Sequence, residues 1–271
     1  MNRYLKLVHM EIYRFRYILA GLMAFTAIFQ ISGFVHKLLL ELSERDRIGV
    51  YPSNELLSFA RIIAHSQFWS IIPMLLCAAV MFLYIFFIWY RDWFGRSTFI
   101  YRLLMLPTAR SHIYWAKATA ILLFVFSLLS FQLLVLLVQK LIFNLAVPAS
   151  QRVEPFFTEL LRANQAFDLL FPYSFEQFVY TYGLGMFAVF AIFTAIIIER
   201  SYRGIGILYG IIYLTISVMA VLLPPYFMGI DGSAAYLYPG EILTIEVLIC
   251  GLVLSASLFI GTRLLSRKIS V

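Results

Sequence analysis

Six long apolar runs most constrain what this chain can fold into. Each run holds about the 20 residues that an α-helix needs to cross some 30 Å of hydrocarbon. The runs are continuous rather than alternating, which excludes a transmembrane β-barrel. Only 13% of the 271 residues are charged, against about a quarter in a soluble domain. We therefore predict an all-α membrane protein with six spans, at about residues 17–36, 68–90, 114–138, 178–198, 204–223 and 242–262.

A basic segment, residues 2–16, precedes the first predicted span. Its apolar residues share one helical face, at Leu5, Val8, Ile12 and Phe15, and its basic residues lie mostly opposite. Such a pattern is typical of an amphipathic helix that lies in the membrane interface rather than crossing it. A basic start before an apolar run also resembles a secretory signal. The run is too long for one, however, and no convincing small-x-small cleavage site follows, which favours an uncleaved anchor.

The charge distribution predicts the orientation of the chain. Six spans place both termini on one side of the membrane, together with the 90–117 loop and the 199–203 turn. That side holds 14 of the 21 Lys and Arg residues and 3 of the 14 Asp and Glu residues. By the positive-inside rule this side is cytoplasmic. We expect a multi-pass protein of the cell membrane with both termini in the cytoplasm. Its formal charge of +7 then reflects topology and contact with membrane lipid, not nucleic-acid binding.

The predicted outer loops, residues 37–67 and 139–177, are longer than simple turns. Each contains a short amphipathic segment, one with Leu56, Phe59 and Ile63 and the other with Phe156, Phe157, Leu160 and Leu161. These segments are either helices resting on the outer leaflet or the lining of a vestibule through which a substrate leaves. The last outer loop, residues 224–240, is followed by Glu241 and Glu246 and is a candidate to dip back into the membrane edge, against protein or water.

The motifs of common enzyme active sites do not occur. The chain has no H-E-x-x-H, no G-x-S-x-G and no G-x-x-x-x-G-K-[ST] phosphate loop. Cys77 and Cys250 each lie inside an apolar run without a C-x-x-C spacing, which indicates small buried residues rather than a disulfide or metal site. The four histidines are isolated from one another in the sequence. We therefore predict no catalytic residue, no metal site and no bound cofactor in this chain.

The polar residues of the predicted spans argue against an ion-driven transporter. The central parts of the spans carry amides and hydroxyls but no Asp, Glu, Lys, Arg or His, whereas ion-driven transporters usually place a charge near mid-membrane. Gln30 and Gln132 either form hydrogen bonds between helices or contact a substrate. An apolar, hydroxyl-lined path suits lipids, hydrophobic peptides or amphiphilic drugs better than small ions.

Two features mark the boundary between the fourth and fifth spans. Glu199 is followed directly by Arg200, which predicts an ion pair at the end of a helix rather than a proton site. Gly206 and Gly210 have the G-x-x-x-G spacing that lets two membrane helices approach closely.

The stretch from Trp89 to Lys117 separates the second span from the third. It holds one acid and five basic residues, namely Asp92 against Arg91, Arg96, Arg102, Arg110 and Lys117. Phe99, Leu103 and Leu106 share one helical face, and Pro107 stops that helix. This pattern predicts a short amphipathic helix on the membrane surface. It either passes force from a soluble partner into the bilayer or is a basic loop that only sets topology.

This stretch resembles the ABC-2 type permease family, the membrane halves of ATP-driven exporters. In that family a charged, glycine-containing turn follows the second span, as in residues 91–96 here. A run of leucines and a Pro-x-x-Arg come next, as in residues 103–110, and a lysine enters the third span, as Lys117 does. The amphipathic start, the six spans and the inside termini agree with the resemblance. The chain departs from the family in having Arg91-Asp92 where a Glu-Arg pair is usual.

The resemblance implies a transport subunit without its own ATPase site. Such a subunit pairs with itself or with a similar subunit, and two separate ATP-binding cassette subunits, which hold ATP and Mg, dock below. Residues 91–113 would be the coupling segment between the spans. Its contacts to the ATPase would come from Arg96, Phe99, Arg102, Leu103, Leu106 and Arg110. The expected function is export of a hydrophobic or amphiphilic peptide, lipid or drug.

An alternative of a different class is a non-transporting membrane scaffold or sensor whose basic loop recruits a cytoplasmic partner. Copurification distinguishes the two hypotheses, because a permease should bring down an ATPase that carries a Walker motif.

Overall fold

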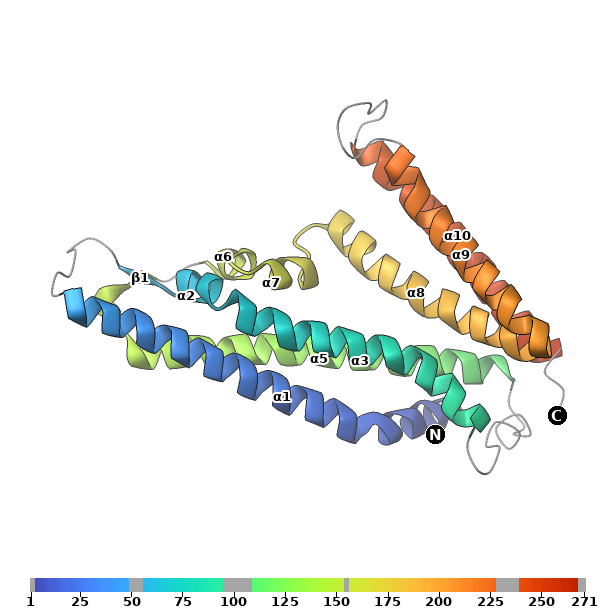
Figure 1. Cartoon of the computed structure of the whole chain (residues 1–271), viewed down its shortest axis with the longest axis horizontal. Helices are drawn as coiled ribbons and strands as arrows, with labels where there is room; N and C mark the ends of the chain where they lie inside the picture. The colour runs from blue at the N-terminus through green and yellow to red at the C-terminus, as the bar shows by residue number, and fades with distance from the viewer. Residues whose placement is uncertain (1–2, 49–55, 95–108, 154–155, 228–238, 268–271) are drawn as a thin grey trace. The chain divides into compact units, whose positions relative to one another are not determined.

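The computed structural model describes residues 3–48, 56–94, 109–153, 156–227 and 239–267 (Figure 1). Most of these residues are helical. The long helices are α1 (Arg3–Ile48), α3 (Gln67–Phe94), α5 (Ser111–Ala146), α8 (Phe175–Ser201), α9 (Arg203–Phe227) and α10 (Pro239–Arg267). The short elements are β1 (Leu57–Ser58), α2 (Phe59–His65), η1 (Ala149–Gln151), β2 (Arg152–Val153), α6 (Phe157–Arg162) and α7 (Gln165–Leu170).

The six long helices are long and apolar enough to cross a membrane. Each predicted span falls within one of them, in chain order. The prediction of an all-α, multi-pass membrane protein with six spans is therefore confirmed. The side that each terminus faces stays a prediction, and the predicted coupling helix falls mostly on residues 95–108, outside the described residues.

Helix α1 joins two segments that the sequence analysis separates. The described part of the predicted interfacial helix, residues 3–16, and the first span lie in one helix of 46 residues, about 69 Å long at 1.5 Å per residue. The buried face agrees only in part with the predicted apolar face, because Val8 and Phe15 are buried but Leu5 is 51% exposed, while Leu7, outside that face, is buried. The Tyr4 hydroxyl lies 2.6 Å from Thr119 Oγ1 of α5. The first turns of α1 thus pack against protein.

The chain divides into two compact units whose boundaries fall inside α1, α3 and α5. The first unit takes the described parts of Met1–Ile12, Phe82–Ile121 and Tyr173–Val271. The second takes those of Tyr13–Met81 and Leu122–Pro172. Each unit is described by itself below.

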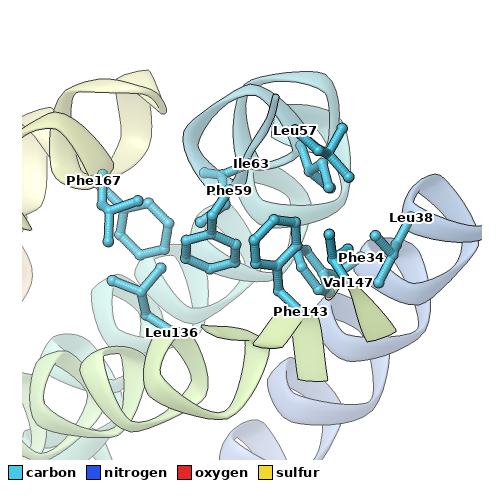
Figure 2. Packing of buried hydrophobic residues seen from close by; sticks show 11 residues of the cluster. Phe34, Leu38, Leu57, Phe59, Ile63, Leu136, Phe143, Val147 and Phe167 are labelled. Carbon is cyan, nitrogen blue, oxygen red and sulfur yellow. The ribbon is translucent and has the colours of Figure 1, made fainter. Parts of the chain in front are cut away.

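In the second unit, the two predicted outer loops form one joined structure. Strands β1 and β2 pair in parallel, Leu57 with Arg152 and Ser58 with Val153. Helices α1 and α5 run past the predicted span ends to Ile48 and Ala146 and present apolar side chains to the loop helices. Figure 2 shows the resulting cluster, which consists of Phe34, Leu38, Leu57, Phe59, Ile62, Ile63, Leu136, Phe143, Val147, Leu160 and Phe167.

This cluster explains where the amphipathic loop segments bury their apolar faces. The Phe59 ring lies between the rings of Phe34 and Phe143, with centroid separations of 5.6 and 5.4 Å. Ile63 and Leu160 are buried as their predicted faces require, whereas Phe156 is 77% exposed. The loop helices therefore pack against protein and against one another. Sequence periodicity identifies the apolar faces but not their partners, because the partners of Phe59 lie in other helices, at Phe34 and at Phe143.

In the first unit, α8 is the packing centre for α9 and α10. A Cβ placed on Gly206 would lie 2.2 Å from the Glu199 carbonyl oxygen, so α9 approaches the backbone of α8 closely, as the G-x-x-x-G spacing predicts. The Thr194 hydroxyl of α8 donates to the Ser257 carbonyl of α10 at 2.9 Å. The Ser257 hydroxyl in turn lies 2.5 Å from the hydroxyl of Tyr213 on α9. Close backbone packing and interhelical hydrogen bonds thus join the three helices.

Candidate functional site

Four charged side chains of the first unit form a buried ionic cluster: Glu11 of α1, Arg91 and Asp92 of α3, and Lys117 of α5. The Lys117 ammonium donates to Glu11 Oε1 at 2.9 Å, to Asp92 Oδ2 at 2.5 Å and to the Ile88 carbonyl at 2.7 Å. These contacts use all three N–H groups of the lysine. Arg91 Nη2 donates to Glu11 Oε2 at 2.7 Å. The ionic cluster therefore joins three helices through charge-assisted hydrogen bonds.

The helical spacing of α3 explains how one ammonium meets two of its acceptors. Ile88 and Asp92 are four residues apart, so they lie one above the other on the same helical face. Asp92 is in the last turn of α3, which ends at Phe94, and Lys117 is in the second turn of α5. The indole of Trp89, completely buried, lies with its ring centroid 5.3 Å from the lysine nitrogen and adds a cation–π contact.

The charges of the ionic cluster balance, with two cations and two carboxylates. Glu11, Asp92 and Lys117 are 1–2% exposed. Taking each ion out of water costs several kcal/mol, and only pairing with good geometry offsets that cost. The cluster is therefore sensitive to the loss of any one partner, which would leave a buried charge without compensation.

A second polar contact ties α3 to the C-terminal end of α8. The Tyr90 hydroxyl donates to the Glu199 carboxylate. Arg200 Nη2 lies 3.5 Å from Glu199 Oε1, so the predicted ion pair is present. The same guanidinium lies over the rings of Tyr90 and Trp93, 5.2 and 5.6 Å from their centroids. A cation is also favoured here by the helix dipole of α8.

The structure describes only one of the six residues that are predicted to contact the ATPase. Five of them lie outside the described residues, namely Arg96, Phe99, Arg102, Leu103 and Leu106. Arg110 is described, and its Nη1 donates to the carbonyls of Leu265 and Ser266 at 3.4 and 3.3 Å. The described residues that flank 95–108 are thus attached to α1, to α8 and to the last turns of α10.

Gln30 and Gln132 lie together in the second unit. Gln132 Nε2 donates to Gln30 Oε1 at 2.7 Å, and Gln30 Nε2 lies 3.4 Å from the Ser70 carbonyl of α3. The backbone carbonyl of Gln30 also accepts from Gln139 Nε2 at 3.3 Å. Both side chains are buried, so they form the interhelical hydrogen bonds that one of the two interpretations assigns to them.

A pocket lies beside this pair. Gln132 borders a cavity of about 220 Å³ whose other polar lining groups are Thr26 and Cys77. The remaining walls come from apolar residues of α3, α5 and α7. The pocket has the apolar character that we expect for a hydrophobic substrate or a lipid chain.

Two acids have roles that the sequence analysis does not predict. Glu11 was counted with the cytoplasmic charges, but it lies on the buried face of α1. Its spacing gives the signal, because it stands three residues after Val8 and four before Phe15, both buried. Glu246 falls near the start of the predicted sixth span and is named there only beside the last outer loop. It is a residue of α10 and is only 8% exposed.

Among the residues that the structure describes, no three or more His, Cys, Asp or Glu side chains are grouped so that they could hold a metal ion. No family model, curated protein or solved structure matches the chain.

Proposed function

We propose that the chain is the permease subunit of an ABC transporter and that it exports a hydrophobic or amphiphilic substrate with ATP hydrolysed by a separate subunit. The observation that carries the proposal is the position of the ionic cluster. Arg91 and Asp92 begin the 91–113 coupling segment, and Lys117 follows its end. Both ends are held by the same buried group of charges.

A surface segment can move membrane helices only if both of its ends stay attached to those helices under load. Removing one partner of a buried ion pair costs about 3–5 kcal/mol, so the attachment of Asp92 to Lys117 resists such a pull. Glu11 extends that attachment to α1 through Lys117 and Arg91. A displacement of the coupling segment would therefore act on α1, α3 and α5 together.

Two further contacts would carry the displacement to other helices of the first unit. Tyr90 joins the end of α3 to α8 through Glu199, and Arg110 joins the start of α5 to the end of α10. Rigid-body movement of packed helices around such attachments is a known means of alternating access. In this proposal the coupling segment tilts the spans when the ATPase closes on ATP.

The energy for such movement has to come from outside the chain. The sequence contains no G-x-x-x-x-G-K-[ST] loop, and the central parts of the spans carry no Asp, Glu, Lys, Arg or His. An ATP-binding cassette subunit holding ATP and Mg supplies the missing chemistry. Phe99, Leu103 and Leu106 would pack into its surface, each contributing roughly 1.5–3 kcal/mol if fully buried. The arginines of the segment would meet acidic groups at the rim, and a second copy or a similar permease subunit would complete the pathway.

The test is a pair of substitutions on one turn of the coupling segment. Leu103→Asp places a charge on the proposed ATPase-facing side, whereas Leu104→Asp makes the same change about 100° around the helix. We expect the Leu103 variant to stay in the membrane but to lose both ATPase association and transport, and the Leu104 variant to keep both. Unchanged association and transport in Leu103→Asp, or equal losses in the two variants, would contradict the proposed contact.

A further inference from the structure

A second pocket lies in the first unit between α8 and α10, which converge toward their C-terminal ends (Figure 1). Its volume is about 160 Å³. Tyr180 and Gly183 line it from α8, and Glu246, Cys250 and Gly251 line it from α10. It does not include any residue of the ionic cluster or of the coupling segment.

Glu246 is the charged group of this pocket. Its side chain belongs to a residue that is only 8% exposed, and it forms no hydrogen bond or ion pair with another described residue. An ionisable residue within a membrane span is costly unless something compensates its charge. The second half of the pocket lining, on α10, therefore presents a largely buried acidic side chain whose carboxyl group receives no hydrogen bond from another described residue.

The pocket is polar at one end and apolar along the rest. On α10 its lining runs along one helical face from Glu246 to Leu254, a rise of about 12 Å. The carboxyl group lies at the end nearest the start of the helix. Farther along, two glycines leave open space, because a Cβ placed on Gly183 or Gly251 would meet nothing within 4 Å. The cavity thus matches the polarity of an amphiphile that has a charged head group at one end and a short apolar body.

We infer that this pocket binds a cationic amphiphile, with an ammonium head group at Glu246 and an apolar body beside Gly183 and Gly251. A neutral chain would leave the carboxyl group uncompensated, and an anionic head group would be repelled by it. The ring of Tyr180, which also lines the pocket, can add a cation–π contact to an ammonium group. Charge complementarity therefore favours a cationic head group over a neutral or anionic one on an apolar chain that fits the pocket.

Binding at this pocket does not depend on the proposed transport function, although naming the ligand as a transported substrate does. The experiment accordingly uses the purified full chain without any ATPase, in nanodiscs of phosphatidylcholine. Saturable binding of radiolabelled decyltrimethylammonium is measured after subtraction of empty nanodiscs, with decanol and decyl sulfate as competitors. If the cation binds but no ATPase associates with the chain, the proposed transport function is wrong and the binding site remains supported. If an ATPase associates but the cation does not bind, only the binding site is wrong.

Three variants test the contacts. Glu246→Gln keeps the shape of the side chain and should weaken binding of the cation by about tenfold or more, since each 1.4 kcal/mol is a factor of ten and a buried charge pair exceeds that. Glu241→Gln removes the same charge from an exposed position on the same helix, and binding should change by less than about twofold. Gly251→Leu should also weaken binding, because its side chain would occupy the apolar part of the cavity without meeting the backbone.

Several results would overturn the inference. Equal losses in Glu246→Gln and Glu241→Gln would mean general attraction of cations to a negative surface. Full binding by Glu246→Gln, or competition by decanol as strong as by the unlabelled cation, would show that the carboxyl group selects nothing. A third result would assign the carboxyl group to a contact between two copies of the chain. In that case the wild-type chain would be a dimer that does not bind the cation, and the Glu246→Gln variant would be a monomer.

Discussion

Replacing Lys117 with methionine tests the physical basis of the ionic cluster. The substitution keeps the length and apolar stem of the side chain but removes the ammonium that donates to Glu11, Asp92 and the Ile88 carbonyl. The group is 1% exposed, so water does not replace the lost hydrogen bonds. Two carboxylates then share the single charge of Arg91. The expected loss of stability is about 3–5 kcal/mol.

A second variant separates the charge from the packing. In the double variant Lys117→Met with Asp92→Asn, one cation and one anion are removed together. The remaining charges, Glu11 and Arg91, balance each other at 2.7 Å. Replacing both members of a buried ion pair by neutral groups is often close to neutral in stability, so the double variant should be more stable than Lys117→Met.

The assay is thermal unfolding of the purified chain in nanodiscs, followed by tryptophan fluorescence. At about 2 °C per kcal/mol, the slope expected for a chain of this size, the Lys117→Met midpoint should fall by about 6–10 °C. Lys140→Met, on the same helix but half-buried and outside the ionic cluster, should shift it by about 1 °C or less. A Lys117→Met midpoint equal to wild type, or a double variant less stable than the single one, would refute the reasoning.

Two further substitutions test packing, one in each unit. In the first unit, Gly206→Leu should separate α9 from α8 and lower stability by about 1–3 kcal/mol, because its Cβ would overlap the Glu199 carbonyl. Gly204→Leu, where a Cβ has open space, should not lower stability, and equal unfolding midpoints for the two variants would be evidence against the close approach. Phe143→Ala should cost about 3–5 kcal/mol and speed proteolysis of the loop helices in the second unit. Leu145→Ala, at an 81% exposed site, should leave both unfolding and proteolysis unchanged, and a similar loss there would argue that the aromatic cluster does not hold the loops.

Apolar runs were sufficient to predict the spans, because hydrocarbon thickness sets a length that few soluble segments reach. They could not set the ends of α1 and α5. Both helices continue past the predicted spans into stretches that carry charges, such as Glu41 and Lys140. A helix that packs on other protein can extend beyond the apolar run, so hydropathy underestimates its length.

The partners of buried charges were harder to predict than the charges themselves. Asp92 and Lys117 were both noted in the basic stretch, and Glu199 with Arg200 was predicted as a pair. Glu11 was not connected to Lys117, since the two are 106 residues apart and nothing in either local pattern specifies a long-range contact. The same limit explains why the two outer loops were treated separately, although β1 and β2 pair.

Glu246 shows a different limit. It lies inside the predicted sixth span, yet its place near the span's start made it look interfacial. The burial of Glu246 and the space left by Gly183 and Gly251 depend on how α8 and α10 pack. Helical periodicity places a residue on a face but does not show whether that face meets lipid, protein or a cavity.

The central claim is that a separate ATPase pulls on the segment anchored by the ionic cluster. Its most direct test is purification of the full chain from its native membranes, with identification of associated proteins and measurement of ATP hydrolysis in the complex. The account predicts an associated ATPase with a G-x-x-x-x-G-K-[ST] motif, whose hydrolysis rate changes when wild-type chain is replaced by Leu103→Asp. Isolation of the chain without any such ATPase, or a rate that is the same with both forms, would contradict it.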